Sequence, residues 1–356
     1  MATERARARC LERLELLADS AQDVDSLRRE VIAELKGTIG FDRWCAALVD
    51  PDTLIAHTGI AETDHIAELP RMLIEDGSCR ELNSGASLTR NRDRNRVGVL
   101  SAATEGDLAR SRRWRECLER FGTGDELRVL AADERGCWGR FDIWRDRDDR
   151  RFDADDAEFV RHASAALGRG MRRVTVGLRD AAPAVPRDTG VLLVGADLRP
   201  QGGTPAIYAW FRALNPASMP YQDGIPSLVW SCIGRLLAAE AGEEPQRLVR
   251  IRVRAADGSW AVIEAARLND AGHGIAVTVH AAAVDEVLGL VARAYGLSNR
   301  ERELAALIAE GHDTQVIADR MSISRYTVQD HLKSIFDKLG VRSRLELLIR
   351  LFAQAA

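Results

Sequence analysis

The chain has 356 residues, a length at which we expect two or three domains, each large enough to bury a core of its own. Hydrophobic residues make up 46% and charged residues 29% of the sequence, which is ordinary for a globular protein in water. The formal net charge of −4 excludes a basic field over the whole molecule, so any surface that binds nucleic acid must be a local patch.

The amino-terminal segment is charged and lacks the apolar core of a signal peptide. No stretch approaches the roughly 20 apolar residues that a membrane helix requires. The cysteines are never spaced as CxxC, and no pair of histidines accompanies them at a metal-ligand spacing; they are Cys10, Cys45, Cys79, Cys117, Cys137 and Cys232. We therefore expect a cytoplasmic protein with reduced thiols, no metal site and no cofactor.

A mixed α/β domain is predicted over residues 20–173, after an amino-terminal helix within residues 1–19. Apolar residues recur at helical spacing in two segments of this domain, 24–37, which Gly37 and Gly40 end, and 153–172. Runs typical of strands lie between them, at 41–49, 54–57, 126–132 and 137–144. The order of helix, strand pair, long excursion, hairpin and closing helix resembles a GAF domain.

Five residues of this domain are candidates for contact with a ligand: Trp44, Cys45, His57, Trp114 and Trp138. Residues of these types more often serve as core aromatics, core thiols or hydrogen-bonded histidines, and we favour that role here. A redox switch at Cys45 or Cys137 has less support, because no neighbour in the sequence obviously lowers a thiol pKa.

A second α/β domain is predicted over residues 190–282, after a linker at 174–189 that contains Pro183 and Pro186. Residues 190–199 resemble the opening hairpin of a PAS domain, with a short strand near Leu198. Helices are predicted over 204–214 and 225–241, followed by three alternating strands at 249–254, 260–263 and 275–280. The alternation indicates a sheet with one buried face and one face that is polar or covered. GAF and PAS resemblances both imply sensing of a small molecule or partner, or dimerisation, without identifying the effector.

Four short helices with clear boundaries are predicted in residues 297–356, after a connecting helix within 283–296. Ser298 and Glu301 form a capping box at the first of them, Asp313 and Ser324 cap the next two, and Ser343 and Glu346 form a second box at the last. The last helix carries the apolar residues Leu345, Leu348, Ile349 and Phe352.

The third of these helices has an apolar stripe of Val328, Leu332, Ile335 and Leu339. Its opposite face presents Tyr326, Gln329, Asp330, Lys333 and Asp337. A helix anchored on one side, with hydrogen-bonding side chains on the other, suits the major groove of DNA.

Residues 297–345 resemble the LuxR-type (NarL/FixJ-type) DNA-binding domain. The matching segments are Leu297-Ser298-Asn299-Arg300-Glu301-Arg302-Glu303, Ile308-Ala309-Glu310-Gly311, Ile317-Ala318, Ile323-Ser324, Thr327-Val328, His331-Leu332-Lys333-Ser334-Ile335-Phe336 and Lys338-Leu339-Gly340-Val341-Arg342-Ser343-Arg344. The resemblance covers about a sixth of the chain. It implies a helix-turn-helix domain whose helix over residues 325–339 enters the major groove.

The resemblance also implies roles for particular residues. Gln329, Asp330 and Lys333 match base-facing positions, and a second set, Arg325, Thr327, Arg342 and Arg344, matches positions that approach phosphates. In this family the final helix commonly pairs two subunits, so a homodimer on double-stranded DNA is expected, with RNA polymerase as a further candidate partner.

The sequence departs from the family at Asp313-Thr314-Gln315-Val316, where Asn and Lys are usual, and at Asp330, which brings a carboxylate toward the groove. Residues 297–350 contain nine Lys and Arg against eight Asp and Glu, so attraction to phosphates alone should be weak. Binding should then depend on a dimer and on specific contacts.

The sequence therefore predicts a multidomain α+β protein: a GAF-like α/β domain, a PAS-like α/β domain and a C-terminal all-α tetrahelical helix-turn-helix domain. The predicted function is transcription regulation in response to a small-molecule effector or partner. A signalling enzyme is disfavoured because the HExxH, HxxEH, GxSxG and GxxxxGK patterns are missing from the sequence. A scaffold that acts through protein partners, without sequence-specific DNA binding, stays open as the alternative.

Overall fold

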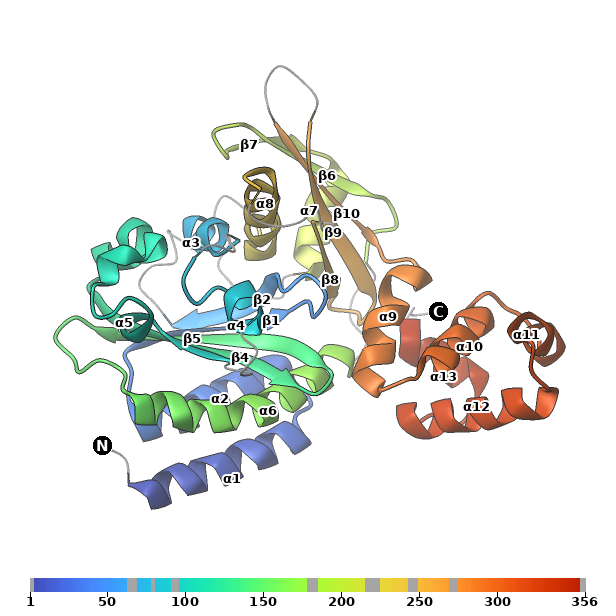
Figure 1. The fold of residues 1–356 in the computed structure, drawn as a ribbon. Helices are drawn as coiled ribbons and strands as arrows, with labels where there is room; N and C mark the ends of the chain where they lie inside the picture. Colours follow the sequence, from blue (N-terminus) through green and yellow to red (C-terminus); the bar gives the residue numbers. More distant parts are fainter. Residues whose placement is uncertain are drawn as a thin grey trace.

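The computed structural model describes residues 3–62, 69–77, 81–90, 96–177, 185–214, 225–242, 249–268 and 274–352. These residues form two α/β units followed by a helical unit at the carboxyl end (Figure 1). The multidomain α+β class predicted from the sequence is confirmed. Within the described residues, no helix combines the length and the apolar character needed to cross a membrane.

The first unit is a five-stranded antiparallel sheet in the order β2-β1-β5-β4-β3. Its strands are β1 (Arg43–Val49), β2 (Ala56–Glu62), β3 (Val97–Val99), β4 (Thr123–Asp133) and β5 (Gly136–Asp146). Three long helices lie under one face of this sheet (Figure 1): α1 (Glu4–Ser20), α2 (Val24–Ile39) and α6 (Ala154–Val176). Each helix turns its apolar side toward the sheet, so these sides and the inner side chains of the sheet form one core.

Short helical segments lie over the opposite face of the same sheet. They are α3 (Leu69–Asp76), α4 (Gly85–Arg90), α5 (Leu100–Ala103), and the turns at Leu108–Arg110, Trp114–Leu118 and Glu119–Phe121. A smaller core of Met72, Leu100, Leu108, Cys117, Leu118 and Trp144 forms beneath them.

One helix end in this unit was predicted wrongly. Gly37 does not end α2, which continues to Ile39 and stops at Gly40. Gly40 has φ +66°, a backbone conformation that favours glycine, and its amide donates to Lys36 O. Gly37 has helical neighbours and open space around it, so nothing forces a break there.

The second unit is another five-stranded antiparallel sheet, in the order β7-β6-β10-β9-β8. Its strands are β6 (Gly190–Val194), β7 (Pro200–Gly203), β8 (Arg250–Arg254), β9 (Trp260–Arg267) and β10 (Ile275–Ala281). Helices α7 (Pro205–Leu214) and α8 (Ser227–Glu240) pack on one face and complete its core. The predicted strand near Leu198 was misplaced: Leu198 has φ +61° and lies in the turn that precedes β7.

The other face of this second sheet is covered along β8 and more open along β6 and β10, where Leu193 is 40% exposed. Arg252 and Arg254 are both buried. Arg252 forms a bidentate ion pair with Asp50 of the first unit, and Arg254 donates to Gly177 O beyond the end of α6 (2.8 Å). Of the predicted linker at 174–189, residues 174–176 belong to α6 and 178–184 lie outside the described residues.

The two α/β units meet along α3 and α8, where the backbones touch. A Cβ atom on Gly77 would lie 2.4 Å from the carbonyl carbon of Gly234, and one on Gly234 would lie 2.7 Å from Ile74 Cα. Both positions therefore require glycine, because backbone atoms on the far side cannot give way. This contact fixes the first unit against the second at one edge.

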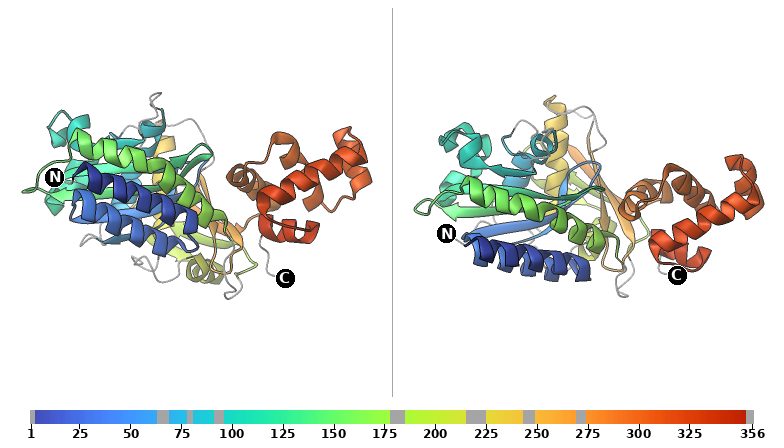
Figure 2. Two further views of the ribbon diagram at one scale, coloured as in Figure 1. Left: turned by 90° about the horizontal axis from the view of Figure 1, so that it is seen from below. Right: turned by 60° about the horizontal axis from the view of Figure 1, so that its bottom comes forward.

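The helical unit begins with α9 (Val284–Tyr295), and continues with α10 (Asn299–Ala309), α11 (Thr314–Met321), α12 (Arg325–Leu339) and α13 (Arg344–Phe352). Figure 2 shows α10–α13 projecting from the end of the molecule opposite the amino terminus. Each of α10, α11 and α12 begins at its predicted cap, Ser298, Asp313 or Ser324. The cap at α13 follows only half of the prediction: Ser343 Oγ accepts from Glu346 N (3.1 Å), but the Glu346 carboxylate accepts from Arg342 N (2.7 Å).

Candidate DNA interface

Helices α11 and α12 are joined by a tight turn of three residues. Ser322 adopts the left-handed conformation (φ +54°), and Ile323 N donates back to Ala318 O at 3.0 Å. Ser324 Oγ then accepts from Thr327 N at 3.0 Å and so starts α12. The turn therefore closes both helix ends and fixes the direction in which α12 leaves α11.

Helix α12 divides into a buried and an exposed face, as its sequence predicts. Val328 and Ile335 are fully buried, and Leu332 and Leu339 are each 3% exposed. The base-facing candidates Gln329, Asp330 and Lys333 are all exposed on the opposite side. Tyr326, near the start of the same face, is 77% exposed. The structure thus brings the three predicted side chains together on one solvent-facing stripe.

A buried carboxylate attaches α12 to α10, a role that the sequence did not reveal. Glu301 accepts hydrogen bonds from Ser298 N (2.6 Å), Ser334 Oγ (2.6 Å) and Lys338 Nζ (2.6 Å). These hydrogen bonds hold the pKa of Glu301 at about 2, although burial alone would raise it. The prediction from sequence was only that Glu301 completes a capping box; Ser334 and Lys338, four residues apart on the edge of α12, were the available sign of a second role.

The predicted phosphate contacts fall at two places on the domain. Arg325 and Thr327 lie in the first turn of α12, where Arg325 Nε donates to Gln315 Oε1 and Thr327 Oγ1 lies 2.9 Å from Ser324 Oγ. Arg342 is exposed between α12 and α13, whereas Arg344 is half-buried. Arg344 donates to Thr314 Oγ1 (2.8 Å) at the start of α11, so part of its guanidinium stabilises the domain itself.

The outward face of α13 is apolar. The inward residues are Leu347 and Leu351, both fully buried, whereas Leu345 is 68% and Ile349 is 45% exposed. Of the apolar residues that the sequence analysis noted on this helix, Leu345 and Ile349 therefore lie outside the core of the domain. Helix α13 is apolar on two sides, and periodicity alone does not say which side faces inward.

The five predicted ligand contacts in the first unit do not meet in one place. Trp44 and Trp138 belong to the core between the sheet and the three long helices. Cys45 and Trp114 pack with the smaller core on the other face of the sheet. Each tryptophan has a partner within the protein: Trp44 Nε1 donates to Glu62 (3.0 Å), Trp114 Nε1 to Thr123 O (3.1 Å) and Trp138 Nε1 to Asp133 (3.3 Å). His57 is buried, with Nδ1 at 3.1 Å from Thr58 Oγ1.

Burial also raises the pKa of the thiols of this unit, to about 11 at Cys45 and about 12 at Cys137. A protonated thiol is a poor nucleophile, so neither cysteine has the character of a redox switch. Among the residues that the structure describes, no group of three or more His, Cys, Asp or Glu could hold a metal ion.

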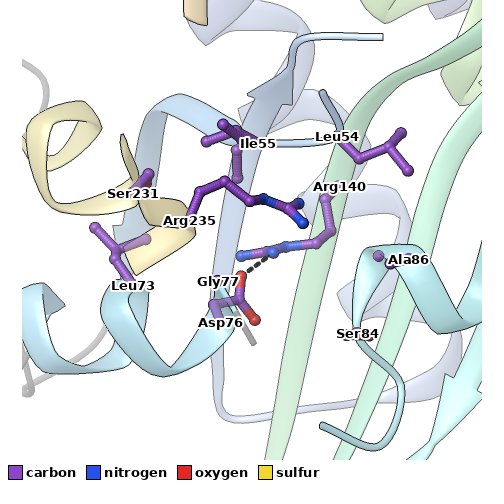
Figure 3. A pocket seen from close by; sticks show the side chains of 12 residues that line it. Leu54, Ile55, Leu73, Asp76, Gly77, Ser84, Ala86, Arg140, Ser231 and Arg235 are labelled. Atoms are coloured by element: carbon purple, nitrogen blue, oxygen red, sulfur yellow. Dashed lines mark hydrogen bonds and ion pairs between the residues drawn. The ribbon is translucent and has the colours of Figure 1, made fainter. Parts of the chain in front are cut away.

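A buried ionic network in the first unit was missed at the sequence level. Asp76 of α3 pairs with Arg113 (2.9 Å), Arg128 (3.0 Å) and Arg140, and Figure 3 shows the last of these pairs. Asp142 pairs with Arg128 (2.6 Å) and Arg140 (3.0 Å) on neighbouring strands. The three arginines hold the pKa of Asp76 well below its usual value, against the effect of burial. The alternation of charged and apolar residues in β4 and β5 was the available signal, but it is equally typical of a solvated face.

Comparisons with known proteins concern mainly the carboxyl end. The sequence profile described as "Bacterial regulatory proteins, luxR family" matches residues 296–351. The probable transcriptional regulatory protein SgaR of Hyphomicrobium methylovorum is 54% identical over 48 residues, 14% of this chain and 23% of that protein. The transcriptional regulatory protein DesR of Bacillus subtilis is 38% identical over 61 residues, 17% of this chain and 31% of that protein.

A longer match is to the putative HTH-type transcriptional regulator Rv0890c of Mycobacterium tuberculosis, 30% identical over 213 residues, 55% of this chain and 23% of that protein. The chain thus spans less than a third of the length of these relatives. Among solved structures, the Vibrio cholerae VqmA–ligand–DNA complex has 20% identity and a TM-score of 0.20 over 46% of this chain and 80% of that one, an overlay too poor to support an argument.

Proposed function

Since residues 296–351 form a helix-turn-helix domain of the luxR family of bacterial regulatory proteins, we propose that the chain is a transcription regulator that reads DNA through α12. One observation supports this more than any other: α12 is anchored by four buried apolar side chains and exposes Gln329, Asp330 and Lys333 on its free face. Such a helix fits the major groove without a change in the domain, because nothing in the protein occupies its polar face among the described residues.

The contacts to bases would be made by Gln329, Asp330 and Lys333. Gln can form a bidentate pair with adenine, Lys can donate to guanine, and Asp can accept from the amino group of cytosine. Arg325, Thr327 and Arg342 would approach phosphates, with the part of Arg344 that is not engaged by Thr314. The near balance of charges in this domain makes specific contacts more important than general attraction to DNA.

The protein would bind DNA as a homodimer. The exposed Leu345 and Ile349 on α13 form an apolar strip of the kind that pairs two copies of a domain. Two-fold symmetry then places two copies of α12 about one helical turn of DNA apart, roughly 34 Å. We place this activity in the cytoplasm, with RNA polymerase as a candidate partner at the promoter.

The GAF-like unit (20–173) and the PAS-like unit (190–282) would provide the sensory part. In the GAF-like unit the first hairpin, β1–β2, lies beside β5, the last strand of that sheet in the sequence. In the PAS-like unit the first hairpin, β6–β7, likewise lies beside β10, the last strand. This order agrees with the two resemblances. Neither unit contacts DNA in this proposal; both would set the position of α9.

Helix α9 is held by both sensory units, which supports a coupling role. Its last carbonyls meet the first unit: Ala294 O accepts from Arg135 (2.6 Å) and from Arg172 (2.8 Å). In the same last turn, Arg293 pairs with Asp52 of the first unit (2.5 Å), and the same carboxylate group accepts from Arg252 of the second unit (2.6 Å). A change in how the two units meet would therefore move α9 and, through it, the DNA-binding domain.

The test begins with selection of DNA fragments by the purified full chain. Affinity for the selected fragment is then measured by fluorescence anisotropy at physiological salt, for the wild type, Lys333→Ala and Arg212→Ala. Arg212 is an exposed cation on α7 and serves as the control for the loss of one positive charge. We expect Lys333→Ala to bind about tenfold more weakly and Arg212→Ala to bind like the wild type. Equal binding by Lys333→Ala, or selection that yields no preferred sequence, would leave the scaffold alternative as the better account.

A further inference from the structure

Tyr326, in the first turn of α12, has the highest exposed fraction of any large apolar side chain among the described residues, at 77%. Within the part of the chain that the structure describes, its hydroxyl forms no hydrogen bond, and no ring or cation packs on its ring. The side chain therefore contributes little to the fold of the domain. Single exposed apolar residues are common on protein surfaces, so the direction in which this one points decides what it can do.

The geometry of α12 fixes that direction. Successive residues of an α-helix are about 100° apart around the axis, and the four buried side chains mark the inner side of this helix. Tyr326 comes seven residues before Lys333, which places the two side chains within about 20° of each other and about 10 Å apart along the axis. Tyr326 therefore lies near the middle of the solvent-facing stripe, on the side opposite the buried residues.

The two neighbours of Tyr326 point to the sides of the helix. Arg325 and Thr327 each lie about 100° away from it, in opposite senses. Arg325 Nε donates to Gln315 Oε1 of α11, and Thr327 Oγ1 lies 2.9 Å from Ser324 Oγ. Both were assigned above to phosphates, which border the groove. A side chain midway between them is directed at the base edges, which the first residues of a recognition helix commonly contact.

The ring of Tyr326 adds an apolar group to a face that is otherwise polar. Gln329, Asp330 and Lys333 end in hydrogen-bonding or charged groups. In the major groove, thymine differs from the other bases in carrying a C5-methyl group, and apolar side chains recognise thymine by packing on it. The flat ring of a tyrosine suits this contact, because it covers a methyl group without requiring a hydrogen bond.

We propose that Tyr326 is a fourth base-reading residue of α12 and recognises a thymine by packing its ring on the C5-methyl group. The proposal rests on the DNA reading by α12 that is proposed above, and it names one base of the preferred sequence. Tyr326 and Lys333 point the same way about 10 Å apart, and base pairs follow one another at roughly 3.4 Å. The thymine therefore lies about three base pairs from the base pair that Lys333 contacts.

The test uses the DNA fragment that the full chain selects, with affinity measured by fluorescence anisotropy at physiological salt. Each thymine of one half-site is replaced in turn by deoxyuridine, which pairs in the same way and lacks only the methyl group. We expect the wild type to bind about fourfold more weakly at one position, the effect of losing roughly one buried methyl group. That position should lie about three base pairs from the one at which Lys333→Ala alters the preference.

Variants then identify the residue. Tyr326→Ala should bind the thymine fragment and the deoxyuridine fragment equally well. Tyr326→Phe keeps the ring and lacks the hydroxyl, so it should still distinguish the two fragments about fourfold. Tyr208→Ala removes another exposed tyrosine, on α7, and should distinguish them as the wild type does.

Several results would overturn the proposal. It is wrong if no deoxyuridine substitution weakens binding by the wild type, or if Tyr326→Ala still distinguishes the two fragments. Loss of the distinction in Tyr326→Phe would assign the contact to the hydroxyl instead of the ring. Wild-type affinity of Tyr326→Ala for the thymine fragment would leave the ring for a protein partner. Selection without any preferred sequence would instead overturn DNA reading by α12 and this inference with it.

Discussion

The DNA-binding domain and the first sensory unit use charged side chains in opposite ways. In residues 297–352, Glu301 is the one charged side chain that is buried among the described residues. In the first unit the side chains of Asp76, Arg113, Arg128, Arg140 and Asp142 are at most 9% exposed and are paired with one another. The helical domain places nearly all its charges in solvent, whereas the first unit also holds a cluster of charges in its interior.

This difference has consequences for how each region responds to change. A solvated charge contributes little to stability and can be exchanged without disturbing the fold. A buried pair is stable only while both partners are present, because an unpaired charge in the interior is strongly unfavourable. A helical domain with solvated charges and an α/β unit whose packing depends on charge balance thus occur in one chain, and three carboxylates, two with buried side chains and one exposed, test the contrast.

The largest effect is expected at the centre of the ionic network. Asp76→Asn would leave Arg113, Arg128 and Arg140 with too few negative charges, and should lower the free energy of unfolding of the first unit by about 3–5 kcal/mol. Urea unfolding followed by tryptophan fluorescence would measure it, since Trp44, Trp114, Trp138 and Trp144 all lie in this unit.

Asp148→Asn provides the matched control, because it removes the same charge from the same unit at an exposed position. The control should unfold at the wild-type urea concentration. If Asp76→Asn were as stable as Asp148→Asn, the network would not have the structural role given to it here, and the contrast between the two regions would disappear.

An intermediate effect is expected at Glu301, whose pKa of about 2 lies below its ordinary value of 4.5. A carboxyl with a depressed pKa stabilises the folded state above its unfolded pKa, and this contribution is lost as the pH falls through the folded pKa. Glu301→Gln should therefore destabilise the contact between α10 and α12 by about 2 kcal/mol at pH 7.

The pH dependence distinguishes this from a simple packing defect. Hydrogen exchange in peptides from α12 should be faster in Glu301→Gln than in the wild type at pH 7, and the difference should shrink as the pH falls below about 4.5. Glu303→Gln, an exposed neighbour on α10, is the control. A difference that stays constant down to low pH would contradict the assigned role of the Glu301 charge.

These two carboxylates also show how far the sequence could predict the structure. The helices of the DNA-binding domain follow from local signals, since Ser298, Asp313 and Ser324 each cap a helix and Val328 to Leu339 form one stripe. The exposed set Gln329, Asp330 and Lys333 follows from the same stripe by exclusion. Contacts between residues close in the chain were therefore predicted well.

Contacts between distant segments were not predicted. Asp76 and Arg140 are 64 residues apart and Glu301 and Lys338 are 37 apart. The local patterns show charged positions but do not say which distant residue is the partner. The ligand candidates do not form one site for a related reason. Tryptophan, cysteine and histidine were chosen by residue type, without regard to the side of the sheet. Trp44 and Cys45 face opposite sides of one strand, because neighbouring side chains in a strand alternate. Which side of α13 faces inward is likewise set by tertiary packing.

The smallest effect is expected at Asp330, the exposed carboxylate on the DNA-facing stripe of α12. Since the side chain is in water, Asp330→Ala should leave the Tm unchanged. Its effect should appear only on DNA, where a carboxylate repels phosphates and can accept a hydrogen bond from the amino group of a cytosine in the major groove. Affinity for unselected DNA should rise about threefold at physiological salt, and the preference for one base pair of the selected sequence should fall.

Asp337→Ala removes the same charge four positions beyond Lys333 and should change the general affinity without altering the preferred sequence. If both variants kept the wild-type preference, Asp330 would act only as a charge, and base reading by hydrogen bonds from α12 would be confined to Gln329 and Lys333.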